Sequence, residues 1–375
     1  MSRLSKFAEG LRVLDLSLFL PGPLAGLLLA DMGANVLKIE PPSGDPMVDL
    51  GPRDQKGGAA FYESVNAGKT VQRADLKDAG VQRAFVEMVR TADILIEGFR
   101  PGVMKRLGLD FKAMREINPR LIYCSLSGWG EGGPDEQLAG HDGNYLAAAG
   151  IIHRNGGDRP FVYDPPIADT TASLFAVIAI LGAVNARRID GKGCHIDLAL
   201  ADVAMPLQLF QVAGLGATGR VPQAAGSYLN GGAAFYQVYG TRDGRHVMLG
   251  AVEAKFWRAF CLAAGHREWV DRQGEPMPQN GLINEVGAFL QTLTMEECIS
   301  IFVPADCCLT PVLDLGEAIM SPHHASRRIV RLTEDGDLQA LFPTKIDRVS
   351  PLSRPPLLRI AETDRTFAFP PAKTS

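Results

Sequence analysis

The first 130 residues alternate regularly between short apolar runs and stretches with helical periodicity. The runs typical of buried strands occupy residues 11–17, 35–40, 71–74, 93–97 and 120–127. The helical stretches lie between them, at residues 24–32, 81–91, 103–107 and 111–117. Short connections between strand and helix favour a parallel sheet with right-handed crossovers. The pattern therefore predicts an α/β fold with a doubly wound sheet.

The length of 375 residues exceeds what one compact core usually reaches, so we expect two domains. Residues 206–230 are rich in Gly and Ala and are predicted to be a linker. A hairpin pattern around residues 241–244 and helical stretches at 253–264 and 295–302 predict a smaller α+β domain. We place the large domain at 1–205, completed by residues 335–375 wrapping back over it. The small domain is expected at 231–334.

Composition and charge exclude several classes of protein. The net charge of −4 and the pI near 6.0 give no reason to expect nucleic acid or a membrane surface as partner. The six cysteines form no CxxC pair, and Met1 to Gly10 lacks a signal-peptide core. No run of about 18 apolar residues is uninterrupted, and the final Ala-Lys-Thr-Ser is not a peroxisomal address. A cytoplasmic enzyme is the default expectation.

Basic residues follow several predicted strands. The carboxyl ends of parallel strands gather the ligand-binding loops, and in this chain those loops carry Lys38, Lys77, Arg100, Lys105 and Arg106. Such a set is typical of a site for a phosphate-bearing ligand. A solvated rim of charges explains it equally well. The Pro21-Gly22-Pro23 turn lacks the GxGxxG spacing of a dinucleotide site, so no nicotinamide or flavin cofactor is expected.

An imidazole and a carboxylate occur in two short segments that one site can combine. Residues 140–145 read Gly-His-Asp-Gly-Asn-Tyr, and residues 166–171 read Pro-Ile-Ala-Asp-Thr-Thr before a long apolar stretch. Asp169 is expected at the start of a buried helix, where a carboxylate is held ionised. An ionised Asp beside a neutral His can take a proton from one face of a carbon and return one to the other. When each residue is considered alone, Asp169 is typical of a helix N-cap and His141 of a structural residue in a loop.

Several longer stretches resemble one known family over nearly the whole chain. The matching stretches are residues 16–23, 31–40, 66–69, 74–77, 93–108, 127–130 and 306–311. They are similar, in this order, to the family III CoA-transferases, a family that includes the α-methylacyl-CoA racemases. The resemblance implies a Rossmann-like large domain, a smaller α+β domain, and two subunits interlocked like links of a chain. It also implies that CoA thioesters are bound without a metal or redox cofactor.

The resemblance implies a set of CoA contacts in this chain. They are Ala74, Asp75, Leu76, Lys77, Gly98, Phe99, Arg100, Arg106, Gly140, Asp142, Gly143, Asn144 and Tyr145. Pro41 stands where racemase-type members can carry a basic residue. Lys38, just before it, is therefore expected to meet the phosphates instead.

The subgroup within the family decides the chemistry. Transferases resemble this chain at Asp169, the nucleophile that becomes acylated. Racemase-type members share that Asp and add a His in Gly-His-Asp-x-Asn-Tyr and a Glu in Gly-Ala-x-Glu, which are His141 and Glu253 here. The resemblance implies that Asp169 and His141 serve opposite faces of the α-carbon, with Glu253 orienting His141. Backbone N–H groups at the start of the Asp169 helix are expected to meet the enolate oxygen.

Three hypotheses follow, and the first is favoured. The chain is a racemase that inverts the α-carbon of 2-methyl-branched acyl-CoA thioesters, a CoA-transferase acting through acyl-Asp169, or a silent CoA-thioester binder. One departure from racemase-type members is that Thr170, Thr171, Ala172 and Ser173 follow the Asp where glycines are usual. Their side chains are expected either to narrow the pocket or to donate hydroxyls to the oxyanion. Steroid side chains, branched fatty acids and small diacids are all compatible as acyl groups.

Overall fold

The structure is a computed structural model that describes residues 3–54, 56–155, 159–333, 336–360 and 367–369. The chain divides into two units. The larger takes its described residues from Met1–Ala149, Tyr163–Leu207 and Pro322–Ser375, and the smaller from Gly150–Val162 and Gln208–Ser321. The expected boundary after residue 205 lies two residues from this division. Sequence patterns did not indicate that residues 150–162 join the smaller unit or that residues 322–333 join the larger one.

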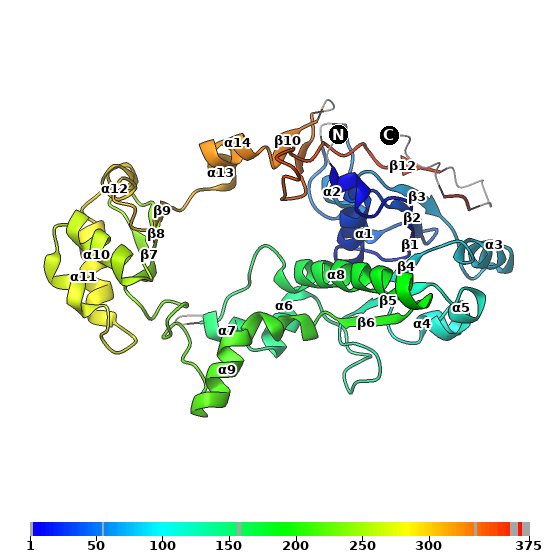
Figure 1. Cartoon of the computed structure of the whole chain (residues 1–375), viewed down its shortest axis with the longest axis horizontal. Helices are drawn as coiled ribbons and strands as arrows, with labels where there is room; N and C mark the ends of the chain where they lie inside the picture. Colours follow the sequence, from blue (N-terminus) through cyan, green and yellow to red (C-terminus); the bar gives the residue numbers. More distant parts are fainter. Residues whose placement is uncertain (1–2, 55, 156–158, 334–335, 361–366, 370–375) are drawn as a thin grey trace. The chain divides into compact units, whose positions relative to one another are not determined.

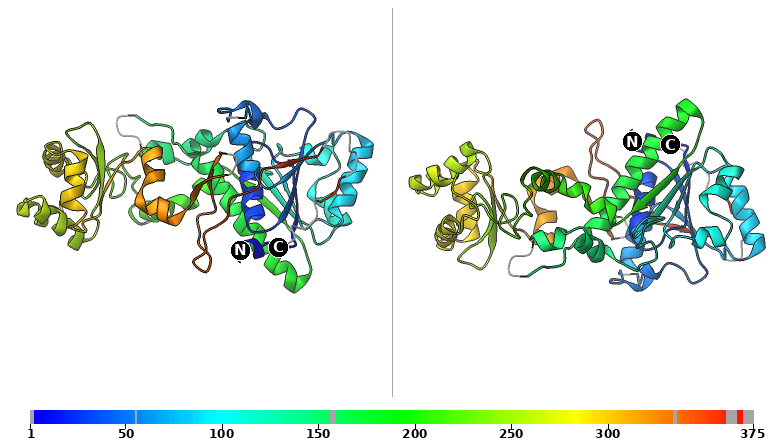
Figure 2. Two further views of the ribbon diagram at one scale, coloured as in Figure 1. Left: turned by 90° about the horizontal axis from the view of Figure 1, so that it is seen from above. Right: turned by 90° about the horizontal axis from the view of Figure 1, so that it is seen from below.

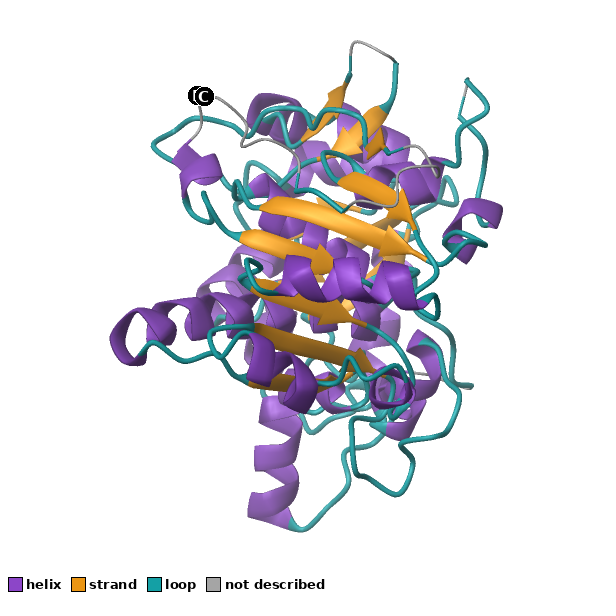
Figure 3. Ribbon diagram, turned by 90° about the vertical axis from the view of Figure 1, so that its right-hand side faces the viewer, coloured by secondary structure: helices purple, strands orange, loops and turns teal. Residues whose placement is uncertain are grey.

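A sheet of seven parallel strands forms the larger unit, in the order β12-β3-β2-β1-β4-β5-β6 (Figures 1 and 3). The strands are β1 (Arg12–Asp15), β2 (Asn35–Glu40), β3 (Thr70–Arg73), β4 (Ile94–Glu97), β5 (Ile122–Ser127), β6 (His195–Ala199) and β12 (Leu358–Arg359). Successive strands proceed outward from β1 on one side and from β4 on the other. This order is that of a doubly wound sheet, which confirms the predicted fold class.

Helices cover both faces of this sheet (Figures 1 and 3). One face carries α1 (Pro21–Asp31) and α8 (Ile167–Asp190), which pack against each other. The other carries α3 (Ala79–Val89), α4 (Val103–Arg106) and α5 (Phe111–Ile117), whose apolar side chains form a core with β1, β2, β4 and β5. The remaining helices of this unit are η1 (Arg3–Lys6), η2 (Pro46–Asp49), α2 (Ala60–Asn66), α6 (Asp142–Ala148), η3 (Asp202–Ala204) and α14 (Pro322–Arg327).

Helix α8 is the one helix among the described residues that is long and apolar enough to cross a membrane by length and composition. The core helix of a globular protein passes the same test. In this chain α8 packs against α1, α6, β5 and β6. Near its end, buried Arg187 donates to the carboxylate of Asp93 (2.7 Å) and to the carbonyl of Arg120 (2.9 Å). Arg187 therefore fixes the helix to the sheet.

The C-terminal segment returns to the larger unit. A hairpin of β10 (Val330–Leu332) and β11 (Leu338–Ala340) precedes it, and β12 then pairs with β3. Both guanidinium nitrogens Nε and Nη2 of Arg354 lie 2.7 Å from the carboxylate oxygens of Asp31, at the end of α1. Residues 334–335, 361–366 and 370–375 of the tail expected to wrap back lie outside the described residues.

The smaller unit is built on an antiparallel sheet of three strands, β7 (Tyr236–Gly240), β8 (His246–Gly250) and β9 (Leu309–Pro311). Its core joins Tyr239 and Leu249 of this sheet to Trp257 and Phe302. The helices are α7 (Ile151–Asn155), η4 (Pro206–Gln208, at the boundary), α9 (Leu209–Thr218), α10 (Ala254–Ala263), η5 (Arg267–Arg272), α11 (Asn280–Leu290), α12 (Met295–Phe302) and α13 (Leu315–Met320). Figure 2 shows α10 to α12 (yellow) on one side of the sheet. Part of the expected linker is helix α9.

Buried charges connect the first three strands of the large sheet. The Lys69 ammonium lies 3.1 Å from Asp15 Oδ2 and donates to Asn66 Oδ1 (2.9 Å) and to the carbonyl of Pro23 (2.7 Å). Burial raises the pKa of Asp15, but Lys69, Lys38 and the hydrogen bonds from Ser17 together hold this pKa below its usual value. Burial lowers the pKa of Lys69 to about 8, against the attraction of Asp15. The pair thus remains charged in a site that excludes water.

We predict that Lys69→Met destabilises the protein by about 3–5 kcal/mol, because it leaves the Asp15 carboxylate buried without its main counter-charge. The free energy of unfolding in urea measures this change. Lys6→Met is the matched control, since Lys6 pairs with Glu9 on the surface and its loss should cost less than about 1 kcal/mol. Equal effects of the two substitutions would contradict the structural role of Lys69.

Candidate functional site

The site lies where the strand order of the large sheet reverses, between β1 and β4. In such sheets ligands bind outside the carboxyl ends of the strands at this point. Helix α1 begins at Pro21, just after the loop that leaves β1. The Ser173 hydroxyl of α8 donates to the carbonyl of Pro21 at 2.7 Å. The first turns of α8, and with them Asp169, are therefore fixed beside the start of α1.

Asp169 is the third residue of α8 and not its N-cap. The helix begins at Ile167, after Pro166, which has no side chain able to cap it. The missing acceptor comes from another helix, because Asp142 Oδ1 of α6 accepts a hydrogen bond from the Asp169 backbone N–H at 3.0 Å. Asp142 therefore joins the starts of α6 and α8. The sequence analysis gave Asp142 only as an expected CoA contact and missed this role, although Pro166 has no side chain that can cap the helix.

The surroundings of Asp169 make it titrate near neutral pH. Burial raises its pKa to about 6, the charge of Asp142 adds to this, and His141 opposes it. Desolvation and a like charge therefore oppose the helix start, which was expected to hold Asp169 ionised. A carboxyl group with this pKa can both accept and donate a proton at working pH.

His141 is the N-cap residue of α6, and its side chain is exposed. Its backbone N–H donates to Asn144 Oδ1 at 3.0 Å, which explains Asn144 in the motif. Tyr145 is buried with its ring edge-on to Trp129, at 5.3 Å between centroids. A Cβ on Gly140 would lie 2.8 Å from the Tyr145 ring, whereas one on Gly143 would meet nothing within 4 Å. Most of the motif therefore serves to hold His141 and Asp142 in place.

Glu253 is the N-cap residue of α10 in the smaller unit, just after β8, and its side chain is exposed. The structure brings His141, Asp142 and Asp169 together in the larger unit. The pairing of Glu253 with His141 stays a prediction.

The residues expected to contact CoA follow β3 and β4 at the carboxyl edge of the sheet. Exposed members are Asp75, Lys77, Gly98, Arg100 and Arg106, and half-buried ones are Ala74, Leu76 and Phe99. The charge of Arg100 also acts on Tyr145. Burial and the charge of Asp169 raise the pKa of this tyrosine, and Arg100 opposes the rise. Among these exposed cations, Arg100 therefore lies near enough to the site to influence the pKa of Tyr145.

Lys38 does not belong to this border. Its side chain is fully buried, 3.1 Å from Asp45 Oδ2, and its ammonium donates to the carbonyl of Ser17 at 2.5 Å. The ammonium is therefore occupied by protein groups beneath the loop that follows β1. The expectation that Lys38 meets phosphates is not supported, since its position in an apolar strand directs it into the core.

The hydroxyls that replace the usual glycines are largely occupied. Thr170 donates to the carbonyl of Pro166, and Ser173 donates to the carbonyls of Pro21 and Asp169. The Asp169 N–H is taken by Asp142. These two hydroxyls and the Asp169 N–H are among the groups that were expected to meet an enolate oxygen. They bind other protein groups instead, and the Asp142 carboxylate occupies part of the start of α8.

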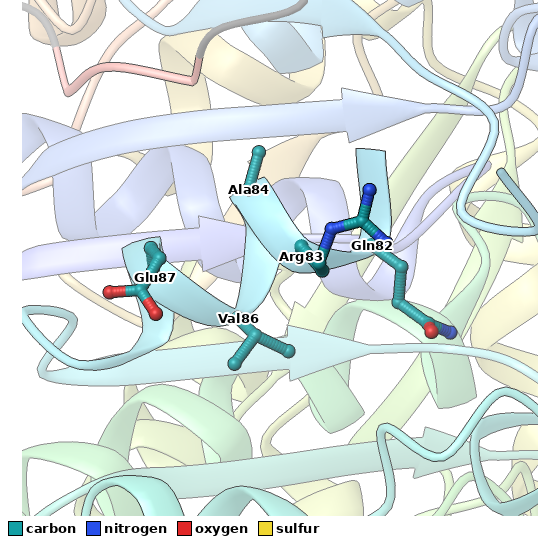
Figure 4. A pocket seen from close by; sticks show the side chains of 5 residues that line it. All are labelled: Gln82, Arg83, Ala84, Val86 and Glu87. Carbon is teal, nitrogen blue, oxygen red and sulfur yellow. The ribbon is translucent and has the colours of Figure 1, made fainter. Parts of the chain in front are cut away.

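Two further features of the described chain lie outside this site. A surface hollow of about 400 Å³ on α3 is lined by Gln82, Arg83, Ala84, Val86 and Glu87 (Figure 4) and contains none of the residues above. Within the described ranges, no three His, Cys, Asp or Glu side chains are grouped to hold a metal ion. His323 and His324 lie in α14.

Comparisons with known proteins identify the family of the chain. The model of the family described as CoA-transferase family III matches residues 8–358. An acetyl-CoA:oxalate CoA-transferase from Acetobacter aceti is 32% identical over 97% of both chains, and the α-methylacyl-CoA racemase of Mus musculus is 31% identical over 95% of this chain and 89% of its own. The crystal structure of a CaiB/BaiF family protein from Brucella suis superposes with a TM-score of 0.82 at 27% identity, covering 94% of this chain and 96% of that one. The chain therefore belongs to the family III CoA-transferases.

Proposed function

We propose that this protein is a racemase that inverts the α-carbon of 2-methyl-branched acyl-CoA thioesters. The observation that carries the proposal is the presence of two proton-transfer groups, Asp169 and His141, at the adjoining starts of α8 and α6. His141 is near enough to lower the pKa of Asp169. A transferase needs the carboxylate as nucleophile, whereas inversion needs a second acid/base on the opposite face of the carbon.

The reaction follows from the two proton-transfer groups. One of them removes the α-proton, and the electron pair of the C–H bond moves into the thioester carbonyl to form an enolate. The other then donates a proton to the opposite face, and the carbonyl reforms with inverted configuration. The roles exchange for the other enantiomer. Glu253 is proposed to orient His141 and to stabilise its imidazolium form, as a third group does in other constellations.

The second candidate is a CoA-transferase, favoured by the 32% identity to the oxalate enzyme. In that reaction Asp169 attacks the thioester carbonyl, CoA leaves as thiolate, and a mixed anhydride forms. The thiolate then attacks the Asp169 carbonyl to give an aspartyl thioester and release the first acid. The carboxylate of a second acid attacks this thioester, forms a new anhydride, and finally receives CoA. His141 has no required step in this sequence.

We predict that the protein exchanges the α-proton of a 2-methylacyl-CoA for deuterium in D₂O, without any acceptor acid, as followed by proton NMR. His141→Ala and Asp169→Asn should each slow the exchange at least about 100-fold, because each removes one proton-transfer group. His246→Ala, at the exposed start of β8, is the control and should leave the rate unchanged.

The other hypotheses give different results in the same experiment. Exchange that is absent from the wild type, together with CoA transfer to an added carboxylic acid that depends on Asp169 alone, would establish the transferase. A thioester that binds without either reaction would establish the silent binder.

We predict a pH profile set by Asp169. In the direction in which Asp169 removes the proton, kcat/KM should rise with pH through about 6, because only the ionised carboxylate accepts a proton. Asp142→Asn keeps the oxygen that caps α8 but removes the like charge, so this limb should move to lower pH. Profiles for both enantiomers measure the shift. Asp190→Asn, at the other end of α8, is the charge-matched control, and an identical limb in wild type and Asp142→Asn would refute the coupling.

We also propose that two copies of the chain associate, with α9 in the contact. No residue of this helix is buried within the chain, and Leu209, Phe210 and Val212 are 68%, 75% and 55% exposed. Such an apolar helix is stable in water when a second surface covers it. The resemblance to an interlocked dimer makes a second copy the partner.

Light scattering should accordingly give a mass of two chains. Phe210→Asp should weaken the association and make the mass fall on dilution. Ile189→Asp, which changes an exposed apolar residue at the end of α8, is the control. A wild-type mass of one chain would contradict the proposal.

A further inference from the structure

A row of polar side chains crosses three neighbouring strands on the face of the sheet covered by α5. It consists of Glu97 at the end of β4, Ser125 on β5 and His195 at the start of β6. Ser125 is the register partner of Glu97 across β4 and β5, where hydrogen bonding from its hydroxyl lowers the pKa of Glu97, and its Oγ lies 3.0 Å from His195 Nε2. Glu97 and Ser125 are 4% and 2% exposed. None of the three residues takes part in the proton transfer proposed above.

The Glu97 carboxylate also fixes the turn that leaves β4. Its Oε2 accepts a hydrogen bond from the Phe99 backbone N–H at 2.8 Å, across Gly98. Arg100 follows directly, and the three residues after Glu97 are all expected to contact CoA. One end of the polar row is therefore a single hydrogen bond away from the CoA-binding loop.

The surroundings of the row are acidic and aromatic. The His195 ring stacks on Phe111 of α5 at 5.0 Å and lies edge-on to Tyr123 at 5.6 Å. Its Nε2 is 3.8 Å from Glu131 Oε1, and the Glu131 N–H donates to Asp197 Oδ2 of β6 at 3.1 Å. Burial raises the pKa of Tyr123 and of Cys124 on β5, and the charge of Glu97 adds to the rise in both.

These surroundings favour a proton on Glu97. Burial raises its pKa to about 7, and the charges of Glu131 and Asp197 add to this. The hydrogen bonds from Ser125 and from the Phe99 N–H oppose the rise. The group therefore changes charge near neutral pH, in the interior, directly behind the loop.

The donors and acceptors of the row can be paired in two ways, in which the hydrogen bonds run in opposite directions. When Glu97 is ionised, Ser125 donates to it and His195 Nε2–H donates to Ser125. When Glu97 is protonated, its hydroxyl donates to Ser125, and Ser125 donates to an unprotonated His195 Nε2. In both states the Phe99 N–H has an acceptor, but only the carboxylate makes that bond charge-assisted and strong.

We propose that Glu97 is a positioning residue for the CoA-binding loop at residues 98–100, which it holds most firmly when the Glu97–Ser125–His195 row has released its proton. The inference rests on the proposed binding of CoA thioesters to this loop. It adds a residue that touches neither substrate nor reacting atoms and acts through the Phe99 amide.

The test is the pH dependence of the affinity for dephospho-CoA, measured by calorimetry between pH 6 and 8. This probe lacks the 3′-phosphate, which itself titrates in that interval. The wild type should bind about fivefold more weakly at pH 6 than at pH 8, because the bond to Phe99 loses its charge. Glu97→Gln retains an acceptor but cannot ionise, so the affinity change due to Glu97 should disappear. Ser125→Ala should move the midpoint to higher pH, since the Ser125 bond lowers the pKa of Glu97.

Glu87→Gln, on the surface of α3, makes the same chemical change and should behave as the wild type. In the exchange assay Glu97→Gln should raise KM for the thioester and leave kcat unchanged. A Glu97→Gln protein with the wild-type pH dependence of binding would overturn the inference, as would wild-type binding that strengthens toward pH 6. Wild-type protein that binds no CoA would overturn it together with the proposed function. Binding with the expected pH dependence but without α-proton exchange would support this inference and count against the racemase alone.

Discussion

The buried pair of Asp15 and Lys69 sets the geometry on which the rest of the larger unit depends. Asp15 ends β1, Lys69 immediately precedes β3, and the Lys69 ammonium also holds the carbonyl of Pro23 in α1. One ammonium thus connects β1, β3 and α1 near the place where the strand order reverses. Separating these charges in a dry interior is costly, so the loops around the reversal have little freedom to shift. A ligand-binding edge built on such a base is largely formed before any ligand arrives.

Asp142 shows how the same carboxylate serves structure and chemistry. As the cap of α8 it satisfies the Asp169 amide, and as a fixed negative charge it raises the affinity of Asp169 for a proton. A neutral cap would hold the helix equally well but leave the Asp169 carboxylate a weaker base. The arrangement therefore couples the placement of the helix to the acid strength of its third residue.

The sequence allowed prediction of the features that depend on local pattern. Strand and helix alternation indicated the doubly wound sheet, and the His141 and Asp169 segments indicated one site. Features that depend on distant partners were not accessible in this way. Lys38 is buried because Asp45 and Ser17 meet it there, and α8 begins before Asp169 because Asp142 caps it from another helix. Helix α9 was hidden by a Gly- and Ala-rich composition that resembles a linker.

The pairing of β12 with β3 has a consequence for the synthesis of the chain. The C-terminal segment supplies both β12, which covers β3, and Arg354, which binds the Asp31 carboxylate. Arg354 and Asp31 are 323 residues apart in the sequence. As the ribosome delivers the chain in N-to-C order, β3 remains an edge with unpaired backbone groups until residues 358–359 emerge. An uncovered edge can pair with the edge of another nascent chain. The short strand β12 therefore covers the edge that β3 would otherwise expose. Chains that are cut off before β12 leave this edge uncovered and are expected to aggregate.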